Sequence, residues 1–346
     1  MPPTRVICWL DTPQVALVRE IAAVSNLRVV GAGSPSRAQR GGVAAELGAE
    51  PVDDLRVALT EGDAEAILIA ALGEFGRSDA SSDAAALLAA RARGVKVLTL
   101  EPFPMSAIDL ATRGWLDSGK GIRPAEVARV VALPWHSRSF RDATEVLASF
   151  GEVRSVGIEA LGHPADGSLA ARLVGALDVM AKLMGEPESI DAAYCTLLKT
   201  PGLHALPGET LADLHGDMAL SARFSRGRAG TILASDQAGA WAFSCVAIGP
   251  GGRLRLHDTG FEWTLPSGEK ADESVQRKGT KAGASTAAQM IGDGVARALD
   301  PHIPDTGPVD WAGVLSMAQA ALLSARTGQG ESPATFRAML GPTLVM

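Results

Sequence analysis

Three side chains that could recognise a phosphate lie together after a strand-like segment. The apolar segment Leu27–Gly31 is followed by Ser34, Ser36 and Arg37. Their hydroxyl and guanidinium groups could hydrogen-bond the 2′-phosphate of an NADP ribose. The alternative is structural, in which Ser34 caps the next helix behind Pro35 and Arg37 is solvated. The sequence leaves both alternatives open.

The turn before the first predicted helix contains no glycine. It joins a predicted strand, Arg5–Leu10, to a predicted helix, Val15–Val24. A dinucleotide site needs glycine here, because only glycine lets the backbone approach the pyrophosphate at the helix N-terminus. Asp11 or Thr12 is instead placed as the N-cap, with Pro13 after it. A capping carboxylate would occupy the N–H groups and repel a diphosphate, so we predict that NAD and NADP bind weakly or not at all.

Other signatures of site chemistry are missing from the sequence. The three cysteines are scattered in apolar contexts, at spacings typical of neither a disulfide framework nor a metal site. His204, His215 and His257 also lack metal-ligand spacing. No Gly-x-Ser-x-Gly elbow, P-loop or Cys–His nucleophile signature is present. We therefore expect no metal site.

The elements that position these residues alternate over the first hundred residues. Short apolar strands alternate with helical stretches, which indicates βαβ units on a parallel sheet. A central strand such as Ala66–Ala70 lacks polar alternation, as expected when both sheet faces are covered. Further elements are predicted at Ser36–Leu47 (helix), Ser81–Arg93 (helix) and Val95–Leu100 (strand). We predict an α/β fold, with an N-terminal Rossmann-like, doubly wound domain over residues 1–120.

A different pattern follows in residues 121–346, which we predict to form a C-terminal α+β domain. Helices are predicted at Gly167–Met184 and Asp310–Arg326. Between them, apolar and polar residues alternate in strands predicted at Leu214–Ser225, Thr231–Ser235, Ala240–Ile248, Arg253–His257 and Phe261–Leu265. This alternation indicates an open, mostly antiparallel sheet with one solvated or partner-covered face, on which we place Trp241 and Phe243. The polar residues 268–286 are predicted to form a mobile loop.

Several short segments occur in an order known from one family. They are residues 26–72, GVKVLTLEPFPMS (94–106), HSRSF (136–140), FGEVRSV (150–156), LMGEPESI (183–190) and ALLSARTGQ (321–329). With the element order, they resemble the glucose–fructose oxidoreductase/inositol dehydrogenase family (Gfo/Idh/MocA) over nearly the whole chain. Members of that family bind NAD or NADP, transfer hydride to or from sugars and polyols, and pair through their C-terminal sheets. The resemblance implies the two-domain fold, an NAD(P) cofactor, a sugar-like ligand and an oligomer.

The catalytic residues of that family are missing from the matching positions. Its Glu-Lys-Pro motif supplies a lysine, and the position before Pro102 is Glu101 here. Its second-domain helix supplies an Asp and a His, which match Ala171 and Gly175 when the helix is anchored on Asp178. The resemblance therefore implies the fold of an oxidoreductase without its standard hydride-transfer apparatus.

Two functions remain open. One is a non-catalytic accessory or binding subunit, a pseudoenzyme that forms a homo-oligomer or a hetero-oligomer with a related protein. The other is an active NAD(P)-dependent oxidoreductase or lyase with relocated chemistry, in which Glu101 and His136 act as acid and base on a sugar-like substrate. The resemblance places His136 and Arg138 near the substrate. The alternative for this Glu–His pair is a structural ion pair or an exposed turn.

The composition excludes several classes of protein. With 346 residues and 47% hydrophobic residues, the chain can form about two domains with buried cores. A formal net charge of −7 without a basic run argues against nucleic acid or an anionic membrane as a partner. No apolar run reaches the roughly 18–20 residues of a membrane span, and no signal peptide precedes the first strand. We therefore expect a cytoplasmic protein.

Overall fold

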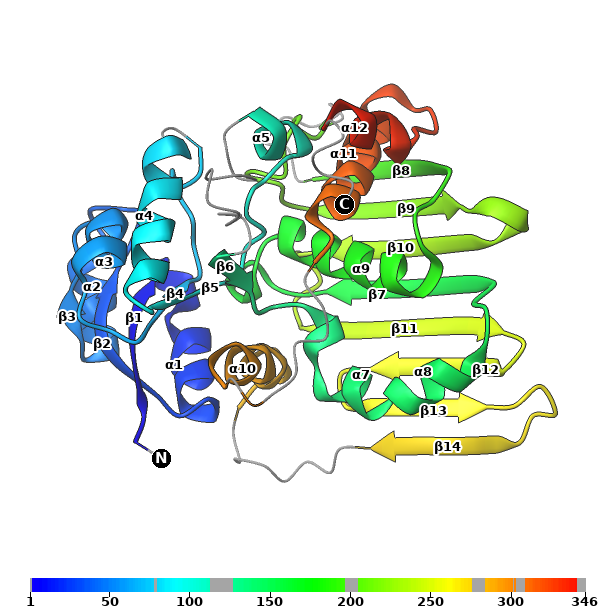
Figure 1. The fold of residues 1–346 in the computed structure, drawn as a ribbon, viewed down its shortest axis with the longest axis horizontal. Coiled ribbons are helices and arrows are strands. Elements are labelled where there is room, and N and C mark those ends of the chain that lie inside the picture. Colours follow the sequence, from blue (N-terminus) through cyan, green and yellow to red (C-terminus); the bar gives the residue numbers. More distant parts are fainter. Residues whose placement is uncertain are drawn as a thin grey trace. The chain divides into compact units, whose positions relative to one another are not determined.

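A computed structural model describes residues 2–77, 80–112, 127–196, 205–275, 284–300, 302 and 309–340 (Figure 1). The chain forms two compact units. Unit 1 comprises residues 1–132 and 283–308, and unit 2 comprises residues 133–282 and 309–346. The sequence predicted one boundary, between residues 120 and 121. The division instead falls after residue 132, and the chain later returns to unit 1 for one more helix.

Unit 1 is built on a six-stranded parallel sheet with the strand order β3-β2-β1-β4-β5-β6. Its strands are β1 (Thr4–Trp9), β2 (Leu27–Gly33), β3 (Glu50–Pro51), β4 (Ala66–Ile69), β5 (Lys96–Thr99) and β6 (Ala128–Val130). Its helices are η1 (Thr12–Gln14), α1 (Val15–Val24), α2 (Arg40–Leu47), α3 (Leu55–Glu61), α4 (Ala80–Ala92), α5 (Ala107–Thr112) and α10 (Thr286–Leu299). This strand order is that of a Rossmann-like, doubly wound sheet, so the predicted fold of the first part is confirmed.

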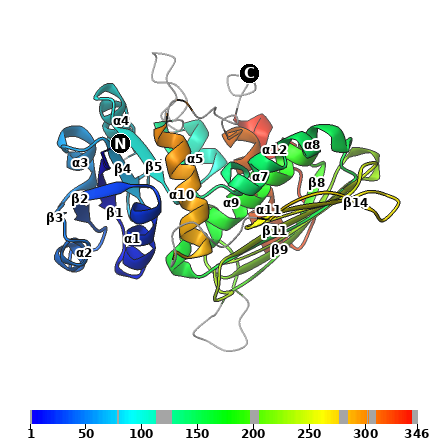
Figure 2. The same ribbon diagram turned by 90° about the horizontal axis from the view of Figure 1, so that it is seen from below.

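Helices cover the centre of this sheet on both sides. In Figure 2, α1 and α2 lie on one side and α3 and α4 on the other. Every residue of β4 is buried, because the strand is shielded from water on both faces. Helix α10, which was not predicted from the sequence, packs against α1 and β5 and so belongs to unit 1 although it comes late in the chain.

Unit 2 is built on an eight-stranded sheet with the order β14-β13-β12-β11-β7-β10-β9-β8. Its strands are β7 (Ser155–Leu161), β8 (Ser189–Cys195), β9 (Asp217–Arg223), β10 (Ala229–Ser235), β11 (Ala242–Gly249), β12 (Gly252–His257), β13 (Gly260–Thr264) and β14 (Lys270–Val275). Its helices are η2 (Pro134–His136), α7 (Arg138–Asp142), α8 (Thr144–Phe150), η3 (Pro164–Asp166), α9 (Leu169–Met184), η4 (Ser225–Gly227), α11 (Trp311–Thr327) and α12 (Pro333–Met339). Among the strand pairs of this sheet that the structure describes, β7–β10 alone is parallel, so the predicted open, mostly antiparallel sheet is confirmed.

One face of this sheet carries the helices of unit 2. Helix α9 packs against β7 and β10, α11 against β8 and α7 against β13 (Figure 2). The predicted alternation follows from this cover. In β9, for example, Met218 and Leu220 are buried, whereas Ala219 and Ser221 are exposed. The opposite face is not covered by any of the described helices of unit 2.

Two details of the sequence prediction for this sheet are wrong. Lys270–Val275 is the edge strand β14 and not a loop, because pairing with β13 satisfies its backbone and an edge strand tolerates charged side chains. Residues 276–283 of the predicted loop lie outside the described part of the chain. Phe243 is on the helix-covered face, since it pairs in register with the buried Ala160 and its ring lies 5.9 Å from that of Phe140.

Trp241 also faces the protein interior. Its ring stacks on the Arg172 guanidinium, 3.9 Å away, and its indole N–H donates to Asp258 at 3.0 Å.

Within the described residues, no helix is both long and apolar enough to span a bilayer.

Candidate functional site

The carboxyl ends of β1, β2 and β4 meet at one edge of unit 1, where a doubly wound sheet binds its ligands. The turn after β1 leads through η1 into α1. The Asp11 N–H donates to Gln14 Oε1 at 3.0 Å, and the Thr12 N–H donates to Gln39 Oε1 at 3.3 Å. The N–H groups of Gln14 and Val15 donate to main-chain carbonyls of the same turn. Pro13 has no N–H, so every backbone donor of this turn has an acceptor within the protein.

Gln14 holds the turn against the neighbouring strand. Its side chain is 7% exposed. Besides accepting from the Asp11 N–H, the carboxamide donates from Nε2 to the Ala70 carbonyl at 2.9 Å, just beyond β4. Asp11 and Gln14 stand at the spacing of a capping box, which was the available sequence signal for this contact. Gln39 lies on a separate segment, so the sequence offered no comparable signal for it.

Asp11 is the N-cap of η1, as predicted, with extended backbone and Pro13 after it. Its carboxylate also accepts from the Ser34 hydroxyl at 3.1 Å. The carboxamides of Gln14 and Gln39 accept from the N–H groups of Asp11 and Thr12. A negative charge lies beside the turn, as the sequence predicted.

The three predicted phosphate contacts are placed very differently from one another. Ser34 is fully buried, and its hydroxyl donates to Asp11 and accepts from the Ser36 N–H at 3.2 Å. Ser36 is half-buried and Arg37 is exposed. The nearby cation that contacts this segment is Arg40, whose Nε donates to the Ser34 carbonyl at 2.9 Å.

Glu101 belongs to unit 1 and His136 belongs to unit 2. Glu101 follows β5 and is 8% exposed; the Thr99 hydroxyl donates to its carbonyl and accepts from its N–H. His136 ends η2 in unit 2 and is half-buried. Arg138 begins α7, is exposed and pairs with Asp142 at 3.6 Å.

The first turns of α9 hold apolar and structural groups. Ser168 caps the helix by accepting from the Ala171 N–H at 3.2 Å. Ala171 is half-buried and Gly175 is buried. Neither position carries a proton-handling group, because alanine and glycine have no titratable side chain. The acid that this helix does bear, Asp178, is paired with Lys182 at 2.6 Å. Burial raises the pKa of Asp178 despite the opposing effect of Lys182.

A histidine–aspartate pair that was not predicted lies, in space, at the N-terminal end of α9, although both residues come later in the chain. His215 Nδ1 is 2.7 Å from Asp236 Oδ2, with Asp236 fully buried and the His215 side chain 55% exposed. Asp236 also accepts from the N–H groups of Gly216 and Leu169 and from Gln237 Nε2. Burial raises the pKa of Asp236, but the hydrogen bonds outweigh it and hold that pKa below its ordinary value. Two residues 21 positions apart gave no sequence signal for this pair.

The predictions about metal ligands can be compared only in part. Among the described residues, no group of three or more His, Cys, Asp or Glu side chains is placed to hold a metal ion. His204 lies outside the described residues. His257 contacts the Thr259 hydroxyl at 3.0 Å.

No protein-family model and no curated protein sequence matches this chain. Solved structures do match. An NAD-binding oxidoreductase from Klebsiella pneumoniae aligns over 95% of this chain and 99% of its own, with 14% identity and a TM-score of 0.64. Levoglucosan dehydrogenase in complex with NADH and levoglucosan aligns over 95% and 99%, with 12% identity and a TM-score of 0.67. A myo-inositol dehydrogenase from Corynebacterium glutamicum aligns over 95% and 98%, with 16% identity and a TM-score of 0.61. The chain therefore has the fold of the Gfo/Idh/MocA-type NAD-binding oxidoreductases, as its sequence resemblance predicts.

Proposed function

We propose that this chain is a diverged member of the Gfo/Idh/MocA family that keeps the fold without hydride transfer and serves as a non-catalytic accessory or binding subunit. In this proposal it binds neither NAD nor NADP tightly. The family positions for lysine, aspartate and histidine hold Glu101, Ala171 and Gly175. A sugar-like small molecule remains the ligand class that the resemblance suggests.

The observation that carries this proposal is the closed turn between β1 and α1. In a dinucleotide site, backbone N–H groups at a helix N-terminus bind the pyrophosphate. Here the carboxamides of Gln14 and Gln39 accept from the N–H groups of Asp11 and Thr12. A diphosphate would have to displace both carboxamides and lie beside the Asp11 carboxylate. Each charge-assisted hydrogen bond that is not formed costs about 1.5–3 kcal/mol of binding free energy.

Isothermal titration calorimetry with NADH and NADPH tests the proposal directly. We expect no saturable binding at micromolar concentrations of either cofactor, and no nicotinamide absorbance in the purified protein. A dissociation constant in the low micromolar range for either dinucleotide would show that the turn opens and that the proposal is wrong.

The second candidate is an active oxidoreductase or lyase that uses Glu101 and His136. It is favoured by the burial of Glu101 in the segment where the resemblance places the catalytic lysine, and by the NADH in the levoglucosan dehydrogenase complex. If turnover of a sugar or polyol is found, Glu101→Gln and His136→Ala should each abolish it. Glu46→Ala on α2 is the control, since Glu46 is an exposed acid outside the segments of Glu101 and His136.

The open face of the eight-stranded sheet supports the assembly part of the proposal. Leu233 on β10 and Ile248 on β11 are 44% and 45% exposed on central strands. Apolar side chains in the middle of an uncovered sheet are typical of an interface. We propose that this face pairs with a second copy or with a related subunit.

Light scattering of Leu233→Glu combined with Ile248→Glu tests this assembly. We expect the wild type to be an oligomer at micromolar concentration and the variant to dissociate at least about tenfold more readily, because two charges enter an apolar contact. Met339→Glu on α12 is the control, since Met339 is 67% exposed away from the sheet. A wild type that is monomeric without a partner argues against the homo-oligomer.

A further inference from the structure

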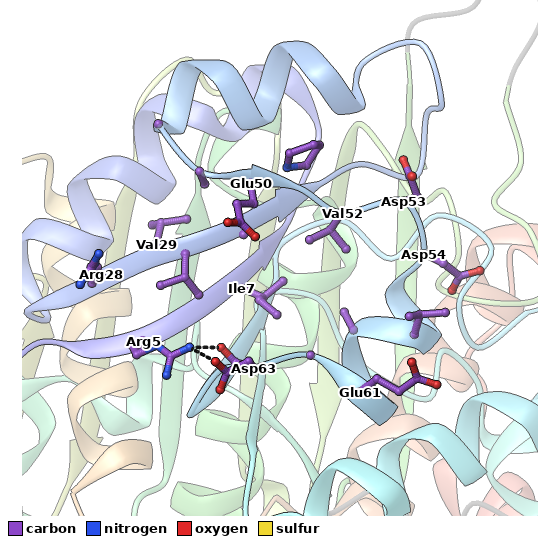
Figure 3. Close-up of a pocket in the computed structure, with 18 residues that line it drawn as sticks. Arg5, Ile7, Arg28, Val29, Glu50, Val52, Asp53, Asp54, Glu61 and Asp63 are labelled. Atoms are coloured by element: carbon purple, nitrogen blue, oxygen red, sulfur yellow. Dashed lines mark hydrogen bonds and ion pairs between the residues drawn. The ribbon is translucent and has the colours of Figure 1, made fainter.

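A hollow of about 1370 Å³ lies on the face of the unit 1 sheet beside α3 (Figure 3). Its floor is formed by Ile7 of β1, Val29 of β2 and Val52, which follows β3. Helix α3 borders it with Val57, which is 52% exposed. The hollow is larger than the roughly 300–1,000 Å³ of pockets that hold small molecules.

The floor is a part of the sheet that lacks a helix. Helices α1 and α2 pack against β2, and they lie on the opposite side of the sheet from α3 (Figure 2). On the α3 side, the described helices leave β2 and β3 uncovered, since α3 itself packs against α4. Parallel sheets normally carry helices on both faces. The hollow therefore lies where a further helix would cover the sheet, and its floor offers apolar side chains to such a helix.

The charges around the hollow are unequal at its two ends. Asp53, Asp54 and Glu61 gather at the end beside α3, whereas Arg28 lies at the opposite end (Figure 3). The second cation, Arg5, is already bound to Asp63 by an ion pair of 2.6 Å. The formal charge of the lining side chains is 2 − 5 = −3, from two Arg (Arg5, Arg28) and five acids (Glu50, Asp53, Asp54, Glu61, Asp63).

The acids at the α3 end are available to a partner. Asp54 caps α3 by accepting from the Arg56 N–H at 2.7 Å. The side chains of Asp53 and Glu61 are both exposed to solvent. Lysine or arginine side chains of a bound helix would complement them, as would the positive end of the helix dipole.

We propose that this hollow docks a basic amphipathic helix of a partner protein, with its apolar ridge on Ile7, Val29 and Val52 and its basic residues beside Asp53 and Glu61. This is the helix-in-groove mode of recognition, in which apolar anchors give affinity and flanking charges give orientation. The proposal uses neither the β1–α1 turn nor the open sheet of unit 2. It can therefore fail or hold independently of the proposed function.

Two synthetic helical peptides test the docking surface on the full chain. Both carry the same leucine ridge; one has lysine on its flanks and the other glutamate. By fluorescence anisotropy, we expect the lysine peptide to bind at least about tenfold tighter, since two or three exposed charge pairs differ between them. Amide shifts in a nuclear magnetic resonance titration should appear in residues 28–31 and 50–61.

A charge-reversed variant supplies the decisive comparison. Asp53→Lys combined with Glu61→Lys should remove the preference for the lysine peptide. Glu46→Lys on α2 is the control, because Glu46 is exposed outside the hollow, on the helix that covers the opposite sheet face. Equal binding of the two peptides, an unchanged preference in the double variant, or shifts outside the hollow would each overturn the proposal. So would self-association of the wild type that the double variant abolishes, because the occupant would then be a second copy.

Discussion

The β1–α1 turn in unit 1 and the first turns of α9 in unit 2 match the two places where the resembling family puts its cofactor and its proton-handling residues. They depart from that pattern in opposite ways. The turn is rich in polar groups, but Gln14, Gln39 and Ser34 hydrogen-bond within the protein. The helix start instead has no polar side chain at Ala171 or Gly175.

This difference separates two ways in which a site can lose its chemistry. A turn closed by its own side chains still has the backbone donors of an anion site, so removing those side chains could release them. A helix with alanine and glycine at the relevant positions has nothing to release. Under the proposed function, we therefore expect ligand binding at the turn to be recoverable by substitution. Hydride transfer by the family mechanism would instead need proton-handling side chains introduced at Ala171 and Gly175.

The largest expected effect concerns hydride transfer itself. The unaltered protein should not oxidise or reduce polyols, aldoses or ketosugars with either nicotinamide cofactor, followed by absorbance at neutral to alkaline pH. Each missing positioned acid or base typically lowers the rate by about 10²–10⁴, and the losses are not additive. Glu101 adds to this, because a carboxylate destabilises a developing alkoxide. Turnover above about 1 s⁻¹ is in the ordinary enzyme range. It would show that the start of α9 has not lost its chemistry, and the contrast with the β1–α1 turn would then be wrong.

The second prediction opens the turn. Asp11→Gly combined with Gln14→Ala removes the negative charge and frees the N–H of residue 11 from its carboxamide acceptor. Affinity for NADH should rise at least about tenfold over the unaltered protein, since one recovered charge-assisted hydrogen bond is worth about 1.5–3 kcal/mol. Calorimetry measures it, with Glu46→Ala on α2 as the control. If affinity does not rise, side-chain occupancy is not what closes the turn.

The third prediction measures how firmly the turn is closed. Gln14→Ala removes two hydrogen bonds of a buried carboxamide and leaves the Ala70 carbonyl without this donor. The free energy of unfolding should fall by about 1–3 kcal/mol, read from urea denaturation. Gln39→Ala removes one longer bond from a half-buried residue and should cost less than about 1 kcal/mol. If the two variants lose equal free energy of unfolding, the burial of Gln14 does not strengthen its hydrogen bonds in the β1–α1 turn.

The fold was predictable because local patterns dominate it. The apolar run of β4 predicts a strand buried on both faces, and the alternation of β9 predicts a strand buried on one face. The helix over Val15–Val24 matches the prediction residue for residue. Three features were missed or misplaced because distant partners decide them. Strand β14 is polar and exists through its pairing with β13. Phe243 is turned inward by the register of β11 on β7, and α10 joins a unit that the chain had already left.

The candidate site was predictable only where contacts are local. Absence of glycine from the turn, and the acid at residue 11, could be read directly. The spacing of Gln14 from Asp11 signalled one of its contacts. Its other contact, with Ala70, joins η1 to the residue after β4, 56 positions further along the chain, and had no sequence signal. The pair of His215 and Asp236 had no local signal, because the turn before β9 and the end of β10 are brought together only by the sheet.

The smallest effect concerns that pair at the start of α9. Asp236 accepts from the Leu169 N–H at the helix start, and its pKa is held below the ordinary value. Since the unfolded carboxyl titrates near about 3.9, the folded state binds the proton more weakly. The stabilisation is therefore present above about pH 4 and is lost as the pH falls through the folded pKa.

Asp236→Asn should accordingly lower the free energy of unfolding at neutral pH by about 1 kcal/mol, because one acceptor oxygen becomes a donor. The difference from the unaltered protein should shrink as the pH falls below about 4 and through the lowered pKa of folded Asp236, because the wild-type carboxyl then becomes protonated as well. Denaturant melts between about pH 2.5 and 7 measure this, with Asp191→Asn on exposed β8 surface as the control. A constant difference across that range would mean that the charge of Asp236 does not stabilise the helix start. The contribution of Asp236 at the start of α9 would then not depend on its charge. In the β1–α1 turn, by contrast, the contribution to stability comes from hydrogen bonds of neutral carboxamides.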